Sequence, residues 1–396
     1  MSSDRGVARA ENGRSKTALV LGGGVGGVVA ANRLRERLPR EHHVVLVDRE
    51  AQHLFQPSLL WLAVGDREPH RIQRPLERLR RKGIDVIRGE ISKINAESRT
   101  ITIDGREITG DAMIVSLGAE LAPEAIPGLA ASGHNLYTVQ GAIAIRDALG
   151  AFRGGRVVVL TAAPAYKCPA APYEAAMLIA AALRRRGVRE KTEIEMYAAE
   201  PGPMGVAGPE VSRAVRQVVE AKGIQYHPEH QVTAVDLKTH RLTFANGATA
   251  EFELLVYVPP HRAPTVVREA GLTNETGWIP VDRGTFETRF PGVYAIGDVV
   301  TVPLSVGKPL PKAGVFAHGE AEVVSANIAN AWSGRATRRV FDGFGECFVE
   351  TGDGRAGFGA GNFYGEPTPQ VTLRQPSRWW HWGKVLFEKR WLWSWF

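Results

Sequence analysis

Two cysteines are the residues of this chain best suited to redox chemistry. Cys168 and Cys347 lie far apart in a sequence of 396 residues. A thiolate attacks disulfide or sulfane sulfur by exchange, so two thiols that meet in space can open and close a bridge. Two cysteines at this spacing form neither a secreted disulfide framework nor a metal site. The alternative for isolated cysteines is that both are buried, unreactive thiols.

Cys168 lies where a nucleotide-binding βαβ unit normally carries its glycines. Residues 156–169 read RVVVLTAAPAYKCP and run from an apolar strand towards a helix expected over 173–186. Glycines in this loop let the backbone approach a pyrophosphate, whereas alanine and proline do not. We therefore expect that this loop no longer binds a nucleotide and presents a thiol instead.

A complete dinucleotide motif lies near the start of the chain. An apolar strand over 17–21 precedes a loop with G-x-G-x-x-G spacing and then a helix. The three glycines of the motif are Gly22, Gly24 and Gly27. The next strand, over 44–47, ends at Asp48, which is placed to accept a hydrogen bond from a ribose hydroxyl. These residues predict a bound dinucleotide.

Two stretches of the chain, 83–115 and 223–257, read alike. Each gives a strand, an alternating hairpin with a glycine turn, and a final apolar strand. A repeat of this size indicates two similar nucleotide-type domains. We therefore predict an α/β fold with two Rossmann-like, doubly wound domains, the second without its nucleotide loop. The expected boundaries are 17–118 with 275–331 for the first domain and 119–274 for the second.

The C-terminal region, 332–396, ends in a segment rich in tryptophan. Residues 378–396 hold six of the nine tryptophans, with four basic residues against one acid. Tryptophan prefers the headgroup layer of a membrane, and lysine and arginine attract anionic lipid. The segment is too short and too charged to span a bilayer, so we predict a helix lying in the membrane interface. The alternative is packing on the protein itself or on a partner copy, and a homo-oligomer stays open.

The remaining composition is that of an ordinary protein with a net charge of +7. Basic clusters lie at apparent helix C-termini, where the helix dipole favours cations, and no nucleic-acid motif is recognisable, so we expect no nucleic-acid partner. The first residues, 1–16, are polar and lack the apolar core of a secretory signal. We interpret them as a disordered tail on a protein of the cytoplasmic side.

Residues 288–298, TRFPGVYAIGD, resemble the second FAD motif of flavoproteins with two dinucleotide domains. The resemblance implies that Gly297 allows close approach and that Asp298 holds the ribityl chain of the flavin. Residues 113–118, ending at Gly118, resemble the strand and turn that precede the crossover into the second domain. Together these segments imply that the first site binds FAD and that 17–118 with 275–331 form the FAD domain.

Combined with these FAD signals, the segment Cys168-Pro-Ala-Ala-Pro-Tyr-Glu174 and the surroundings of Cys347 resemble sulfide:quinone oxidoreductases and the flavin subunit of flavocytochrome c sulfide dehydrogenase. The likeness covers roughly residues 17–365. It implies that both cysteines face the flavin, with Cys347 nearer. It also implies that sulfide opens a bridge between them and that two electrons pass to FAD. Glu174 matches a proton acceptor of the family.

The same resemblance implies where the electrons leave. Lys312 matches a lysine at the flavin and quinone side, at the start of a helix that includes 323–331, and Phe316 and Phe348 are candidates for stacking on the quinone. Many family members carry a third cysteine, which residues 116–141 lack. A mechanism with two cysteines is therefore implied.

The sequence thus predicts a flavoenzyme, peripheral on the cytoplasmic side of the cell membrane, that oxidises sulfide to sulfane sulfur and reduces a membrane quinone. Its partners would be sulfide, the quinone and anionic lipid. One alternative is a flavocytochrome-type sulfide dehydrogenase. A type II NADH:quinone dehydrogenase is another, although it should keep the second glycine loop. A flavin redox sensor without turnover is the third.

Overall fold

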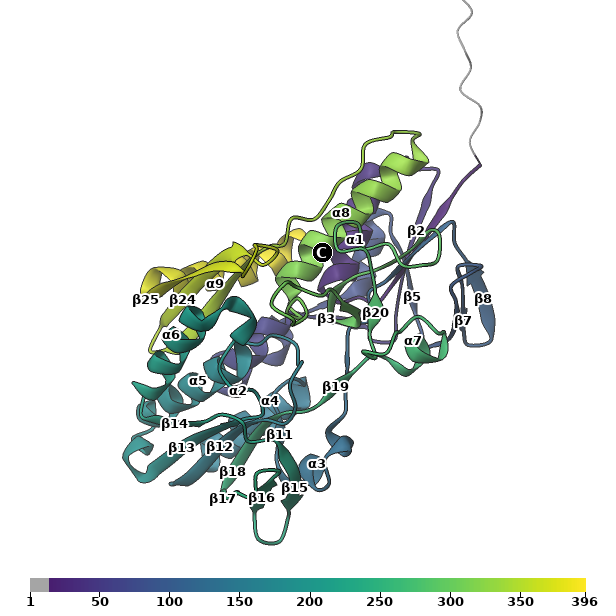
Figure 1. Cartoon of the computed structure of the whole chain (residues 1–396). Helices are drawn as coiled ribbons and strands as arrows, with labels where there is room; N and C mark the ends of the chain where they lie inside the picture. The colour runs from purple at the N-terminus through teal and green to yellow at the C-terminus, as the bar shows by residue number, and fades with distance from the viewer. Residues whose placement is uncertain (1–13) are drawn as a thin grey trace, which may run out of the picture.

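The computed structural model describes residues 14–396 of the chain (Figure 1). Most of the tail expected over 1–16 therefore lies outside the described residues. Ser15 and Lys16 are described, and the Lys16 backbone contacts the loop before the second strand. Its N–H donates to His42 Nδ1 at 3.3 Å, and its carbonyl accepts from the His43 N–H at 2.8 Å.

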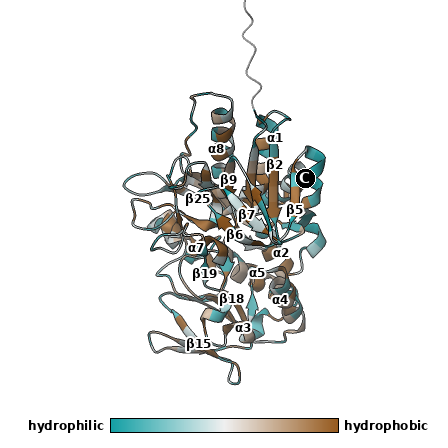
Figure 2. Ribbon diagram, turned by 90° about the vertical axis from the view of Figure 1, so that its right-hand side faces the viewer, coloured by the Kyte–Doolittle hydropathy of each residue, from teal (hydrophilic) through white to brown (hydrophobic). Residues whose placement is uncertain are grey.

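The first domain is built on a five-stranded sheet in the order β21-β9-β1-β2-β5, with all neighbours parallel. The strands are β1 (Thr17–Leu21), β2 (His43–Asp48), β5 (Asp85–Arg88), β9 (Ala112–Val115) and β21 (Val293–Ala295). Their apolar side chains are covered on both faces, which is why each strand reads as a continuous hydrophobic run. Figure 2 shows this as hydrophobic colour on strands such as β2. Helices α1 (Val25–Arg37) and α8 (Gly314–Trp332) pack side by side on this sheet (Figure 1).

The second domain repeats this arrangement. Its sheet has the order β11-β18-β12-β13-β14, again with parallel neighbours. The strands are β11 (His134–Asn135), β12 (Gly155–Thr161), β13 (Thr192–Ala198), β14 (Ile224–His227) and β18 (Leu254–Val258), and the helices are α4 (Val139–Ala151), α5 (Ala171–Arg185) and α6 (Pro209–Glu220). The order β18-β12-β13-β14 corresponds to β9-β1-β2-β5. The predicted fold with two Rossmann-like domains is confirmed.

A small antiparallel sheet accompanies each domain, where the repeated hairpins were expected. One has the order β6 (Ile91–Asn95), β7 (Thr100–Ile103), β8 (Arg106–Thr109), and the other β15 (Val232–Asp236), β16 (Arg241–Phe244), β17 (Thr249–Glu251). The two crossings between the domains pair with each other as β10 (Glu120–Leu121) and β19 (His261–Arg262). The remaining short elements include α2 (Leu59–Ala63), α3 (Leu129–Ser132), α7 (Thr265–Glu269), β3 (Gln52–Leu54), β4 (Gln73–Pro75), β20 (Ile279–Pro280), β22 (Val300–Thr301) and several 3₁₀ helices, among them η3 (Leu76–Lys82) and η7 (Gly297–Val299).

The C-terminal region forms an antiparallel sheet followed by one helix. The sheet contains β23 (Phe344–Gly352), β24 (Arg355–Asn362) and β25 (Gln370–Ser377), and β23 packs against α5. The helix α9 (Arg378–Ser394) starts at Ser377, whose hydroxyl accepts a hydrogen bond from the Trp380 N–H. It leads from this sheet back to the first domain (Figure 1).

Among residues 14–396, no helix combines the length and the apolar character needed to cross a membrane.

Candidate active site

The glycine loop between β1 and α1 has the shape that a dinucleotide needs. Gly22 has φ of +105°, and a Cβ there would lie 2.3 Å from the Ser116 carbonyl oxygen. A Cβ at Gly27 would lie 1.8 Å from the Gly22 carbonyl oxygen, so the helix can approach the strand only with glycine at this position. Apart from Gly24 itself and its two chain neighbours, a Cβ at Gly24 would have no atom of the described residues within 4 Å. The space above the start of α1 is therefore open to a ligand.

The start of α1 also has the charge that a pyrophosphate needs. Gly24 is the N-cap, and within the described chain no side chain caps this end and no acid lies in the first turn. The N–H groups of that turn therefore point to a ligand site, as in other anion-binding helix N-termini. Asp48 lies beside the loop and accepts from the Gly23 N–H and, at 2.7 Å, from the Glu50 N–H. Burial raises the pKa of Asp48. This set of groups fits the pyrophosphate and ribose of FAD.

The second segment that was predicted to bind FAD follows β21, the outer strand of the same sheet. Gly297 follows β21 with φ of +77°, and its N–H donates to Glu320 Oε2 at 2.6 Å. The Asp298 carbonyl oxygen accepts from Lys312 Nζ at 2.8 Å, and the Val300 carbonyl oxygen accepts from the same ammonium at 2.8 Å.

Lys312 and Glu320 are both buried around this segment. The Lys312 ammonium lies 3.5 Å from the centre of the Trp278 ring, and burial lowers its pKa to about 8. Burial also raises the pKa of Glu320, in this case to about 7. A narrow pocket at the start of α8 is lined by Gly297, Lys312, Phe316 and Glu320, among others. The sequence analysis missed Glu320, although an acid within the alanine- and valine-rich helix α8 is a signal that could have revealed it.

Gly118, which was expected to allow the crossover, has φ of +70° and is open on its Cβ side, with no atom of residues 14–396 within 4 Å. A left-handed φ of this kind favours glycine because it has no Cβ. Gly118 thus provides the turn after β9 that the sequence predicted. The fold brings this turn to the same sheet edge as the glycine loop, because β9 and β1 are parallel neighbours.

The two cysteines come from different parts of the fold. Cys168 lies in the loop between β12 and α5 with φ of +48°, and its N–H donates to the Lys312 carbonyl oxygen at 2.6 Å. Cys347 lies within β23 opposite Gly359 of β24. Burial raises the pKa of Cys168 to about 12. Burial, the Cys168 thiol and the Glu174 carboxylate together raise the pKa of Cys347 well above its usual value.

Glu174 and Lys384 form a buried ion pair whose charges act on both thiols. Glu174 Oε1 accepts from Lys384 Nζ at 2.9 Å and from the Glu350 N–H at 2.8 Å. Burial alone would lower the pKa of Lys384, but the carboxylates of Glu174 and Glu350 outweigh burial and raise the pKa. The carboxylate of Glu174 raises the pKa of both thiols, whereas the ammonium of Lys384 lowers it. The buried Glu174–Lys384 pair therefore influences both of the half-buried thiols.

Lys384 belongs to α9 and was missed by the sequence analysis, which treated its segment as a membrane tail. The inner face of α9 is charged. Lys384 binds Glu174, and Glu388 accepts from Arg67 at 2.9 Å and from the Ser58 hydroxyl at 2.7 Å. His381 Nδ1 lies 3.0 Å from Glu350 Oε1. The acidic Glu388 four residues after Lys384 was the available sign that this face is not a plain lipid-facing surface.

The outer face of α9 carries four large apolar side chains. Trp379, Trp382, Leu386 and Trp393 repeat at three-, four- and seven-residue spacing, and their exposed fractions are 84%, 64%, 67% and 83%. Such spacing places them on one side of a helix. The buried side of the helix thus combines the charged Lys384 and Glu388 with Trp391 and Leu392. Its exposed side combines the apolar residues with the basic Lys389 and Arg390.

The Cys168 loop is held by tyrosine hydroxyls. Tyr137 Oη donates to the Lys167 carbonyl oxygen at 2.7 Å. The Glu200 carboxylate accepts from Thr161 and Tyr173, both at 2.8 Å, and from Tyr166. Glu200 lies two residues after the end of β13, and Asp48 is the last residue of β2. In the first domain Asp48 adjoins the dinucleotide loop. The corresponding acid of the second domain, Glu200, is instead bonded to hydroxyl groups of the chain itself.

The two candidate quinone residues lie in different groups of rings. Phe316 is buried in α8, with its ring 5.0 Å from that of Phe363 in an edge contact. Phe348 is half-buried and contacts Phe358 at 5.2 Å and Phe387 of α9 at 6.4 Å. Of the residues predicted for the quinone, Lys312 and Phe316 share the narrow pocket at α8.

Comparison with known proteins places this geometry in a family. The sequence profile of the pyridine nucleotide-disulphide oxidoreductases matches residues 16–321. The chain is 26% identical over 351 residues to the mitochondrial sulfide:quinone oxidoreductase of Mus musculus, an alignment that covers 85% of this chain and 76% of the relative. It is 26% identical over 398 residues to the sulfide-quinone reductase of Aquifex aeolicus, with 96% and 91% covered.

A solved structure agrees with these sequence relatives. The X-ray structure of the sulfide:quinone oxidoreductase from Aquifex aeolicus superposes with a TM-score of 0.87 at 25% sequence identity. The superposition covers 96% of this chain and 91% of that one. The profile match extends over more than three quarters of the chain, and the glycine loop with Asp48 has the geometry that FAD needs. The chain therefore belongs to the pyridine nucleotide-disulphide oxidoreductase family, and it is an FAD-dependent oxidoreductase.

Proposed function

We propose that the protein oxidises sulfide to sulfane sulfur and reduces a quinone at a membrane surface, with Cys168 and Cys347 as the sulfur-handling residues. The observation that carries the proposal is the shared environment of the two thiols around the Glu174–Lys384 pair. Relatives that cover most of the chain are named sulfide:quinone oxidoreductases. This agreement favours sulfide as the reductant and a quinone as the acceptor.

FAD would be held by the glycine loop, Asp48 and Asp298, and when bound it supplies a two-electron acceptor that a quinone can reoxidise. In the proposed reaction, hydrosulfide attacks a bridge between Cys168 and Cys347. The S–S bond of the bridge breaks, one cysteine becomes a persulfide and the other leaves as a thiolate. Burial raises the pKa of both thiols, so such a thiolate is a strong base in this site.

Glu174 and Lys384 would control the proton in this step. The Glu174 carboxylate is the proton acceptor that we assign, because its field reaches both sulfur atoms. The Lys384 ammonium lowers the pKa of both thiols and so favours the thiolate form. In this scheme Glu174 accepts the proton, and Lys384 stabilises the thiolate that is left.

Two features argue against NADH as the reductant. The loop between β12 and α5 contains alanine, proline and Cys168 in place of glycines. The acid after β13, Glu200, already accepts three hydroxyl groups of the chain, so it is not available to a ribose. The alternative of a type II NADH dehydrogenase would need both of these positions.

The outer face of α9 supports attachment to a membrane. Exposed tryptophans prefer the headgroup layer, and Lys389 and Arg390 on the same helix are exposed and attract anionic lipid. Because the charged inner face is bonded to the protein, the apolar face can enter the interface while the helix stays docked.

Anaerobic reduction of the purified flavoprotein tests the reductant. We expect sulfide to bleach the flavin absorbance and NADH to leave it unchanged. Cys168→Ser and Cys347→Ser should each keep FAD and lose reduction by sulfide. Bleaching by NADH alone, or full reduction by sulfide in both variants, would falsify the proposal.

Sedimentation with anionic vesicles tests the membrane surface. The triple substitution Trp379→Ser, Trp382→Ser and Trp393→Ser should leave the protein in the supernatant. Leu237→Ser is the control, because Leu237 is a large apolar residue of the second domain that is 52% exposed. Equal sedimentation of the two variants would rule out attachment through α9.

A further inference from the structure

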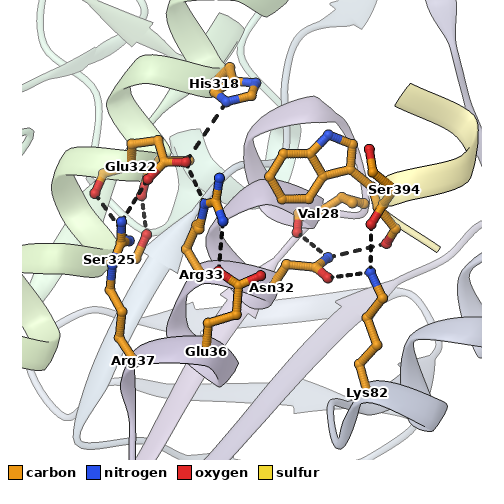
Figure 3. Close-up of polar contacts among 12 residues, drawn as sticks. Val28, Asn32, Arg33, Glu36, Arg37, Lys82, His318, Glu322, Ser325 and Ser394 are labelled. Atoms are coloured by element: carbon orange, nitrogen blue, oxygen red, sulfur yellow. Dashed lines mark hydrogen bonds and ion pairs between the residues drawn. The ribbon is translucent and has the colours of Figure 1, made fainter. Parts of the chain in front are cut away.

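The chain beyond the middle of α9 contacts the FAD domain at several points. Lys82 Nζ donates to the Ser394 carbonyl oxygen and to Asn32 Oδ1, both at 2.9 Å, and Figure 3 shows these groups side by side. Asn32 Nδ2 in turn donates to the Trp395 carbonyl oxygen at 3.3 Å and to the Val28 carbonyl oxygen at 2.8 Å. A lysine ammonium at this position favours the carbonyl end of a helix. The end of α9 is therefore bonded to α1.

Aromatic rings of the same segment, residues 391–396, contact both helices of the FAD domain. The Trp395 ring lies 5.1 Å from the Arg33 guanidinium of α1 and 5.5 Å from the His318 ring of α8. The Trp391 ring lies 5.7 Å from that of His318. Cation–π and edge contacts of this kind add to the burial of the rings. The segment therefore links the first turns of α8 to α1.

One histidine connects this segment to the glycine loop. Trp391 Nε1 donates to His53 Nε2 at 3.0 Å, and His53 Nδ1 donates to the Gly23 carbonyl oxygen at 2.8 Å. The Phe396 ring lies 5.0 Å from the His53 ring. His53 is fully buried, and this pair of bonds requires the neutral ring with its proton on Nδ1. The backbone of Gly23 is thus held on both sides. Its carbonyl oxygen is bonded to His53, and its N–H is bonded to Asp48.

We propose that residues 391–396 form a clamp that retains FAD, acting through His53 on the glycine loop and through Asn32, Arg33 and Lys82 on α1. Gly23 directly precedes the N-cap of α1, where the open space for the pyrophosphate begins. A loop fixed on both sides keeps its N–H groups aimed at the ligand, so release of the loop would weaken the hold on FAD. The inference rests on the dependence on FAD and not on the proposed sulfide and quinone chemistry. His53 and Trp391 are positioning residues here.

The test measures release of FAD from the purified full-length holoprotein, with no sulfide or quinone present. Trp391→Phe keeps an aromatic ring but removes the N–H, and so leaves His53 Nε2 as a buried acceptor without its partner. Free FAD is followed over time by absorbance after ultrafiltration. We expect release to be faster by about tenfold, the factor that corresponds to an unpaired buried group. A chain that ends at Arg390 should release FAD at least as fast.

Trp393→Phe is the matched control, because it makes the same change two residues away on the exposed face of the same helix. Its release rate should stay within about twofold of the parent. Equal rates for Trp391→Phe and Trp393→Phe would overturn the proposal, whether both are slow or both are fast.

If Trp391→Phe lowers the melting temperature of the apoprotein, Lys82→Met distinguishes loss of the clamp from a general loss of stability. This change removes the cation from the Ser394 carbonyl without touching the core. We expect faster release of FAD with an unchanged apoprotein melting temperature. Release as slow as in the parent would then reject the clamp.

Discussion

Removing the ammonium of Lys384 should destabilise the protein strongly, because it leaves a carboxylate buried without its partner. In the native chain the side chains of Lys384 and Glu174 are 5% and 3% exposed, and the N–O distance between them is 2.9 Å. Breaking such a pair from one side costs about 3–5 kcal/mol. At about 2.1 cal/mol/K per residue, unfolding of a chain of this size has an entropy of about 0.8 kcal/mol/K, so the melting temperature of Lys384→Met should fall by about 4–6 °C.

Lys389→Met provides the comparison, because Lys389 lies on the same helix and is exposed. Its melting temperature should stay within about 1 °C of the parent. The double variant Glu174→Gln with Lys384→Met should recover part of the loss, because it no longer buries an unpaired charge. The assay is thermal unfolding followed by circular dichroism. A loss in Lys384→Met no larger than in Lys389→Met would refute the buried pair and the reasoning that places Lys384 beside the thiols.

Three further predictions concern the glycine loop between β1 and α1, His53 and the loop that carries Cys168. Gly24→Ala should fold normally but bind FAD weakly, because its methyl group would enter the open space, whereas Gly27→Ala should fail to fold, because its Cβ would overlap the Gly22 carbonyl. FAD content equal to the parent in purified Gly24→Ala, or a soluble, folded Gly27→Ala, would contradict this. Burial lowers the pKa of His53 from 6.5 to about 4, so the unfolded chain binds the proton first and stability falls by about 3 kcal/mol as the pH drops from about 6.5 to 4. The pH dependence of unfolding should therefore be shallower in His53→Gln, and an unchanged slope would count against the assignment. Tyr166→Phe removes one of the hydroxyl groups bonded to Glu200 and should speed maleimide labelling of Cys168. The labelling rate is measured by mass spectrometry in a Cys347→Ser background. An unaltered rate would show that Glu200 does not hold the loop.

The features that could be predicted from the sequence are those with a local pattern. The glycine spacing of Gly22, Gly24 and Gly27 reports the sharp turn and close packing that the fold requires, and Asp48 follows at the end of the next strand. The two Rossmann-like domains could be recognised because each repeats the same strand and hairpin order within a short stretch. Such patterns are fixed by neighbours in the chain and need no knowledge of distant contacts.

The features that were missed depend on partners far apart in the sequence. Lys384 looks like a surface lysine until Glu174 is known to face it, and His53 has no motif around it that announces Gly23 and Trp391. The periodicity of α9 was also hard to interpret. Its buried side holds Lys384 and Glu388, for which Glu174 and Arg67 provide matching charges, beside the apolar Trp391 and Leu392. Large apolar residues such as Trp379 and Trp393 are exposed instead, which departs from the usual distribution of apolar and charged residues.

The pairing of Glu174 with Lys384 also sets an order of events during synthesis. The two residues are separated by 210 positions, so the carboxylate emerges from the ribosome long before its ammonium partner. At translation rates of about 5–20 residues per second, the interval is about 10–40 s. During that time the second domain can fold, but the pocket around the thiols lacks the charge that makes burial of Glu174 favourable. Maturation of the thiol pocket is therefore a post-translational step that waits for α9, and nascent chains stalled before residue 384 should carry Cys168 in an open, readily oxidised state.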